Sequence, residues 1–80
     1  MLITIEYCAV GHYTSKAAGL AAELLESFES GIKQLTLIPS SGGAFEVTVN
    51  GKLLYSNKQT GRHAEPGEVK VLVGKFIKEG

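Results

Sequence analysis

The sequence predicts an α/β domain of element order βαβββα, a two-layer sandwich with two helices on one face of a mixed four-stranded sheet. Three observations lead to it. Alternating apolar and polar residues indicate a strand at residues 2–7. Apolar residues three and four positions apart indicate helices at residues 14–28 and after Pro66. The pair Asn50-Gly51, between two strand-like runs, indicates a hairpin. The 80 residues are enough for one domain, spanning 1–80.

The first half of the chain is expected to form a strand, a helix and a second strand. Ile3, Ile5 and Tyr7 share the face of the first strand that we expect to be buried. The apolar stripe of the helix consists of Ala17, Leu20, Ala21, Leu24, Leu25 and Phe28. A second strand is expected at residues 34–38, followed by a loop at residues 39–43. Because a helix connects the two strands, they should lie parallel to each other.

The second half is expected to form the hairpin and a final helix. A two-residue turn at Asn50-Gly51 sets the pairing of the hairpin strands. The expected pairs are Val49 with Lys52, Val47 with Leu54 and Phe45 with Ser56 on one face, and Thr48 with Leu53 and Glu46 with Tyr55 on the other. Residues 57–64 form a polar connection, and Pro66 should occupy the first position of the last helix. Its expected buried stripe is Val69, Leu72, Val73, Phe76 and Ile77.

The composition excludes several classes of function. The chain has eight Lys and Arg against eight Asp and Glu, so it lacks the clustered positive charge that nucleic-acid binding requires. No apolar run approaches the ~18 residues of a membrane span, and the N-terminus lacks the features of a signal peptide. A single cysteine cannot form an internal disulfide. We therefore expect a soluble, cytoplasmic protein that binds neither nucleic acid nor membrane.

Cys8, the only cysteine, follows the first strand and precedes the first helix. The positive end of a helix stabilises a thiolate, which is the species that attacks disulfides. The position three residues further on is Gly11, so the chain offers no second thiol to release a mixed disulfide. Release would need an outside thiol such as glutathione. The alternative is that Cys8 is a small buried apolar side chain without chemistry.

The residues around Cys8 each allow two interpretations. His12 can stabilise the thiolate or transfer protons, or it can be a surface residue. Tyr13 is expected to pack on the base of the helix with its hydroxyl outside. Gly42 and Gly43 either form a flexible turn or allow a second backbone to approach the helix N-terminus closely.

The remaining polar residues do not indicate a cofactor site. Arg62 and His63 are expected to be solvated in the polar connection. One cysteine and two histidines do not form a recognisable metal-ligand spacing. No glycine-rich phosphate-binding motif is present. We therefore expect neither a metal nor a bound cofactor.

Four segments resemble a known family. The stretch Tyr-Cys-Ala-Val-Gly-His-Tyr at residues 7–13 resembles the motif of the selenoprotein W-like (Rdx) family, in which the first strand ends in Tyr-Cys-x-x-Cys or Tyr-Cys-x-x-Sec. Residues 43–47 are similar to the family's Gly-x-Phe-Glu-Val strand, and residues 50–56 to its hairpin. Residues 61–66 are similar to its lead into the final helix. The likeness covers nearly the whole chain.

The resemblance implies a thioredoxin-like fold and a thiol oxidoreductase role linked to glutathione or thioredoxin. The first motif cysteine falls on Cys8, whereas the second redox position falls on Gly11 and carries no redox role. His12 stands where the family has glycine. Two hypotheses follow. The protein either forms mixed disulfides with glutathione or protein thiols through Cys8, or it is a redox-inactive adaptor. The adaptor would bind a protein partner or a second copy through the open face of the sheet or the Cys8 loop.

Overall fold

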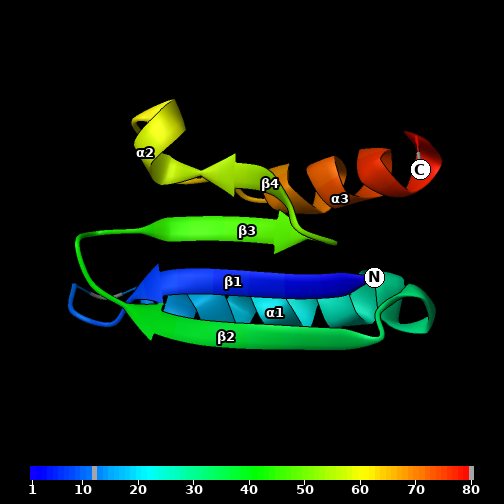
Figure 1. Ribbon diagram of the computed structural model, residues 1–80, viewed down its shortest axis with the longest axis horizontal. Helices are drawn as coiled ribbons and strands as arrows, with labels where there is room; N and C mark the ends of the chain where they lie inside the picture. Colours follow the sequence, from blue (N-terminus) through cyan, green and yellow to red (C-terminus); the bar gives the residue numbers. More distant parts are fainter. Residues whose placement is uncertain (12, 80) are drawn as a thin grey trace.

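A single four-stranded sheet carries both long helices on one of its faces (Figure 1). The computed structural model describes residues 1–11 and 13–79. Its strands are β1 (Leu2–Cys8), β2 (Gln34–Ser40), β3 (Phe45–Val49) and β4 (Lys52–Ser56). Its helices are α1 (Thr14–Phe28), the 3₁₀ turn η1 (Glu29–Gly31), α2 (Asn57–Thr60) and α3 (Glu68–Glu79). The predicted order βαβββα is confirmed, with the short helix α2 inserted in the expected polar connection.

The strands are ordered β2-β1-β3-β4, so β1 is central and β2 lies at an edge. β1 pairs with β2 in parallel and with β3 antiparallel, and β3 pairs with β4 antiparallel. Helix α1 lies behind β1 and β2, and α3 lies behind β4 (Figure 1). The helix between β1 and β2 forms a crossover connection, which makes this pair parallel, and the hairpin makes β3 and β4 antiparallel.

The core lies between the sheet and the two helices. Alternate strand residues face the helices, as the period of two requires. The buried core side chains are Ile3, Ile5, Ala17, Ala21, Leu24, Phe45, Val47, Val49, Tyr55, Val69 and Val73. Two residues of the expected helix stripes depart from this pattern, since Leu25 is 39% exposed and Ile77 is 45% exposed. Both lie at the margin of their stripes, where a helix surface turns away from the sheet.

The predicted hairpin turn is confirmed, but the predicted strand register is wrong beyond its second pair. Asn50 and Gly51 have φ angles of 51° and 83°, as a type I′ turn requires. The register then shifts, so that Val47 pairs with Tyr55 instead of Leu54. The extra residue is a β-bulge, which turns every later side chain of β4 to the opposite face. Tyr55 is thereby buried, at 3% exposure, and its hydroxyl donates to the Arg62 carbonyl at 2.6 Å.

Strand β2 is longer than predicted and includes Pro39 and Ser40, which we expected in the following loop. The N–H of Ala9 donates to the Ser40 carbonyl at 2.9 Å, so Ser40 directs its backbone groups toward β1. Its neighbour Pro39 therefore directs its nitrogen toward the open edge, because successive residues of a strand point their backbone groups to opposite sides. A proline at this position removes no ladder hydrogen bond.

The connection before α3 is more ordered than predicted. Helix α3 begins at Glu68, two residues after Pro66, because Gly67 has a φ of 80° and is not helical. Arg62, which we expected to be solvated, donates from both terminal nitrogens to the carboxylate of Glu68, at 2.7 and 2.8 Å. Glu68 also accepts from the backbone N–H of Glu65 at 2.9 Å. These bonds fix the chain between α2 and α3.

Two adjacent leucines of α1 should differ in their contribution to stability. Leu24 is fully buried, so Leu24→Ala should lower the free energy of unfolding by about 2–5 kcal/mol through lost transfer energy and a cavity. Leu25 keeps 39% of its surface exposed, so Leu25→Ala should cost less than about 1 kcal/mol. Denaturant unfolding of the two variants measures both. Equal costs would contradict the orientation of α1.

The Arg62–Glu68 ion pair should make stability depend on pH at the acid end. The hydrogen bonds from Arg62, and then the one from the Glu65 N–H, lower the pKa of Glu68 from 4.5 to about 2. A lowered pKa in the folded state stabilises the protein above the unfolded-state value, and this contribution is lost as the pH falls from about 4.5 to about 2. The melting temperature of wild type should therefore exceed that of Glu68→Gln at neutral pH.

Across that window the two melting temperatures should converge, and added salt should reduce their difference because both side chains are partly exposed. A difference that is independent of pH would mean that the carboxylate charge of Glu68 contributes nothing to stability.

Candidate functional site

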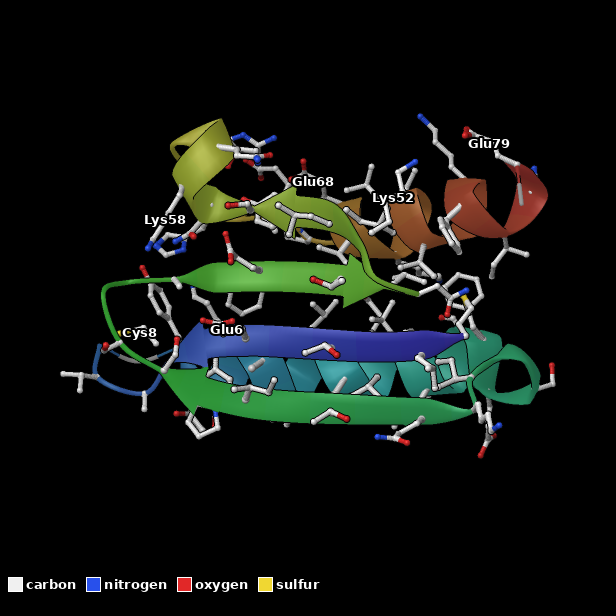
Figure 2. The ribbon with its side chains drawn as sticks, in the orientation of Figure 1. Glu6, Cys8, Lys52, Lys58, Glu68 and Glu79 are labelled. Atoms are coloured by element: carbon white, nitrogen blue, oxygen red, sulfur yellow. The ribbon has the colours of Figure 1, made fainter. Side chains whose placement is uncertain are left out.

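Cys8 is the last residue of the central strand β1, and its backbone is held between the ends of two neighbouring strands. Its N–H donates to the Ala44 carbonyl at 2.7 Å, and the N–H of Ala9 donates to the Ser40 carbonyl at 2.9 Å. The loop from Ser40 to Ala44 therefore passes from one side of Cys8 to the other. Figure 2 shows Cys8 at this end of the sheet. Cys8 is 5% exposed, and Ala44 beside it is 3% exposed.

The sulfur of Cys8 makes one hydrogen bond, in which the thiol donates to the Val10 carbonyl at 2.7 Å. A carbonyl oxygen accepts only from the neutral thiol, so this contact exists in the protonated state and is lost when the thiol ionises. Cys8 lies outside the main core between sheet and helices. Its burial agrees with the interpretation of Cys8 as a buried apolar side chain, whereas its place between the end of β1 and the loop that leads to α1 agrees with the redox interpretation.

Helix α1 begins at Thr14, so residues 9–13 separate Cys8 from its first turn. Tyr13 precedes the helix and makes no side-chain cap, and its carbonyl accepts from the N–H of Ala17 at 2.9 Å. The predicted role of His12 lies outside the described residues and stays a prediction.

Gly11 stands where the family motif has its second redox residue, and its backbone suits glycine. Its φ is 108°, a conformation that residues with a Cβ rarely adopt, although a Cβ would meet no atom within 4 Å. The loop after Cys8 thus turns in a way that depends on Gly11. A cysteine at this position would strain the loop in its present conformation.

Gly42 and Gly43 form a turn that is held in place, and whether another backbone approaches them stays a prediction. Both have positive φ angles, 77° and 72°, so they form the turn between β2 and β3. A Cβ on Gly43 would meet nothing within 4 Å, so the side-chain position of this residue faces open space. Asn57 holds this turn in place, because its amide donates to the Gly43 carbonyl at 2.6 Å and accepts from the Phe45 N–H at 2.9 Å.

Tyr13 contacts strand β3 and the connection before α3. Its ring meets Phe45 edge-on, with centroids 6.3 Å apart, and meets His63 edge-on at 5.1 Å. We expected His63 to be solvated; it is exposed, but its ring packs against Tyr13. Tyr13 therefore links the start of α1 to the connection before α3 and stands apart from the Cys8 hydrogen bonds described above.

A groove of about 380 Å³ lies between α1 and the connection before α3, and the sequence did not reveal it. It is lined by Ser15, Lys16, Gly19, Leu20, Glu23, Phe45, His63, Ala64, Glu65, Pro66, Gly67 and Val69. Cys8, although described by the structure, is not among these residues. The groove arises because residues 63–67 lie beside α1, and no local pattern in either segment encodes that contact. The motif cysteine and the groove are therefore separate features.

Two further findings concern residues 1–11 and 13–79 alone. Within these ranges no three His, Cys, Asp or Glu side chains gather closely enough to ligate a metal ion. Within the same ranges none of the helices has the length and apolar character needed to cross a bilayer.

Comparisons with known proteins agree with this architecture. The family model described as the Rdx family matches residues 2–75. A crystal structure of a selenoprotein W-related protein from Vibrio cholerae superposes with a TM-score of 0.88 at 34% identity, covering 95% of each chain. A crystal structure of a protein from Bordetella parapertussis superposes with a TM-score of 0.87 at 31% identity, covering 94% of this chain and 95% of that one. A comparison with curated proteins gave no significant match.

Two glycine-to-alanine substitutions should have opposite effects on stability. Gly11→Ala should lower the free energy of unfolding by about 1–3 kcal/mol, because φ at Gly11 is 108°. Gly19 lies within α1 with open space around a Cβ, so Gly19→Ala should raise stability by up to about 1 kcal/mol. Urea unfolding of both variants checks the pair. A neutral Gly11→Ala would show that the loop after Cys8 adopts another conformation.

Proposed function

The chain belongs to the Rdx family, and on that premise we propose that it is a thiol redox protein that acts through Cys8 alone. Membership of this family, together with a neighbour named as selenoprotein W-related, supports a thiol redox function in general terms. The observation that carries the proposal for this chain is the position of its single cysteine. Cys8 stands at the carboxyl end of the central strand, at the first position of the family motif, with a short loop next to its sulfur.

The reaction would be thiol–disulfide exchange, in which Cys8 forms a mixed disulfide with glutathione or with a protein thiol that is released from an existing disulfide. The Cys8 thiolate attacks the glutathione sulfur of a glutathionylated protein, the sulfur–sulfur bond breaks, and the protein thiolate leaves. A second glutathione thiolate then attacks the glutathione sulfur of the adduct, which restores Cys8 thiolate and glutathione disulfide. Glutathione is a co-substrate in this scheme and not a bound cofactor. A reducing cytoplasm supplies it in the required form.

Because position 11 is a glycine, the thiol that resolves the mixed disulfide has to come from another molecule. In a dithiol protein the residue at this position attacks the mixed disulfide from within the chain, whereas Gly11 has no side chain to do so. The protein would therefore exchange disulfides one thiol at a time and would not reduce a substrate disulfide by forming an internal one.

Access to the sulfur requires movement of the loop after β1. Cys8 is 5% exposed and its thiol is bonded to the Val10 carbonyl, so this bond has to break before attack. Val10 itself is 79% exposed and packs against little, which makes local opening of residues 9–11 inexpensive.

A redox-inactive binding module is the second candidate, and the burial of Cys8 favours it. A sulfur that stays covered cannot exchange with a disulfide, but two other surfaces of the protein remain available for binding. One is the open face of the sheet, where Leu2, Ile38 and Leu53 are 51%, 41% and 40% exposed. The other is the groove between α1 and residues 63–67. Either could bind a protein partner or a second copy of the chain.

Glutathione disulfide at neutral pH should add one glutathione to the folded protein, at a rate at least equal to that of the same chain in urea. The reason is that the end of β1 would hold the thiolate in an attacking position. Intact-protein mass spectrometry over time measures the adduct, and reduced glutathione should remove it. Cys8→Ser is the matched control and should gain nothing.

The adaptor hypothesis makes the opposite prediction. If the loop keeps the sulfur covered, labelling of the folded protein should be roughly a hundredfold slower than in urea, because it waits for local unfolding. That result would overturn the redox proposal and leave the binding module.

A further inference from the structure

Ser40 has a buried hydroxyl that the fold leaves without a partner. Its Oγ exposes less than 1 Å² of surface and makes no hydrogen bond, and among the buried and half-buried residues of 1–11 and 13–79 no other side-chain nitrogen or oxygen shares both properties. A buried hydroxyl without a partner costs free energy, and proteins rarely retain one. An unsatisfied donor of this kind points to a species that is absent from the resting state.

Ser40 is the direct neighbour of Cys8. The two residues are Cα partners in the parallel pairing of β1 with β2, and each is the last residue of its strand. Residues paired in register across parallel strands direct their side chains to the same face of the sheet. Ile3 and Ile5 point to the helices, so Cys8 and Ser40 belong to the alternate set on the other face. Ser40 and Cys8 are thus adjacent residues on that face, at the carboxyl ends of two neighbouring strands.

The two protonation states of Cys8 need different partners. The neutral thiol donates to the Val10 carbonyl at 2.7 Å, which satisfies it without Ser40. The thiolate has no proton to donate and is repelled by that carbonyl, so it needs a donor instead. Ser40 Oγ is a free donor on the adjacent residue, and hydrogen bonds to a charged acceptor are stronger than those between neutral groups.

We propose that the Ser40 hydroxyl donates a hydrogen bond to the Cys8 thiolate and so stabilises the attacking and leaving form of this sulfur. The inference rests on the proposed function, since it concerns the species that exchanges with a disulfide. When Cys8 attacks, its negative charge passes to the departing sulfur of the attacked disulfide and the hydrogen bond weakens. When a second thiolate resolves the adduct, the charge returns to Cys8 and the bond forms again.

The charged groups near this end of the sheet are few. Glu6 lies on β1 opposite Glu46 of β3, and Glu46 accepts from Ser56 Oγ at 2.8 Å. The Nζ of Lys58 lies 3.9 Å from the point where a Cβ on Gly42 would stand. Figure 2 shows Glu6, Cys8 and Lys58 at the same end of the sheet. Tyr7, Tyr13 and His63 are further titratable side chains on the adjoining segments, and His12 adjoins them in the sequence. The test variants leave all of these unchanged.

The test is the pH profile of Cys8 in Ser40→Ala, Ser40→Thr and Ser41→Ala. Two readouts are used, the ultraviolet absorbance of the thiolate and the rate of alkylation by iodoacetamide. Ser40→Ala should move the midpoint of both profiles upward by about one pH unit and slow alkylation at neutral pH roughly tenfold. Ser40→Thr keeps the hydroxyl and should restore most of the effect. Ser41 is the exposed neighbour, and Ser41→Ala should leave both profiles unchanged.

Thermal melting separates this role from a structural one. The hydroxyl has no partner while Cys8 is a thiol, so Ser40→Ala should melt no lower than wild type at a pH where the thiol is neutral. A variant that melts lower or fails to fold would mean that the hydroxyl has a structural partner, which overturns the inference.

Identical profiles for wild type and Ser40→Ala would also overturn the inference, while glutathione labelling of wild type would still uphold the proposed function. Conversely, a shifted absorbance midpoint without any glutathione adduct would uphold the role of Ser40 and remove the proposed function. The pH profile of Ser40→Ala therefore tests the role of Ser40, and glutathione labelling of wild type tests the proposed function.

Discussion

The central position of β1 is the constraint on which the rest of the structure depends. This strand is hydrogen-bonded on one side to a parallel neighbour and on the other to an antiparallel one, so both neighbours fix its register. Its two faces then have defined roles, with Ile3 and Ile5 directed into the core and Cys8 held at the end of the sheet. The chain before and after the turn at Gly42 and Gly43 contacts the end of β1 from both sides. Any candidate chemistry at this end is therefore placed by strand pairing and not by a flexible loop alone.

Most of the fold follows from local sequence patterns, and the departures have physical causes that act between segments. Helix α1 spans the predicted residues because its apolar stripe and its boundaries both depend on residues that are close together in the sequence. The bulge in β4 was not predictable from the turn at Asn50-Gly51, because it depends on how Tyr55 fits the core and reaches the Arg62 carbonyl. The extension of β2 through Pro39 depends on which side of the strand meets β1, and that choice appears only once the sheet order is known.

The candidate site was predictable to a similar degree. The motif placed Cys8 at the end of the first strand, and the structure confirms that location. What the sequence did not reveal is that Ser40 is its neighbour, because the pairing joins residues 32 positions apart through a strand longer than expected. The groove was missed for the same reason, since it forms between two segments that are distant in the sequence. The motif identifies one residue of a site, and the strand register supplies its surroundings.

Pro39 has a consequence for how this molecule meets other chains. Strand β2 lies at the edge of the sheet, where free N–H and C=O groups invite a further strand to extend it. Toward that edge Leu35 and Leu37 can donate, but Pro39 cannot. The row of donors is interrupted one residue before the strand ends, and a strand added there would lose its hydrogen bonds as it reached the level of Cys8 and Ser40. Strand β2 carries no charged side chain from Gln34 to Ser40 that would discourage such pairing. Pro39 therefore provides the protection against edge-to-edge aggregation at the end of the strand that lies beside Cys8.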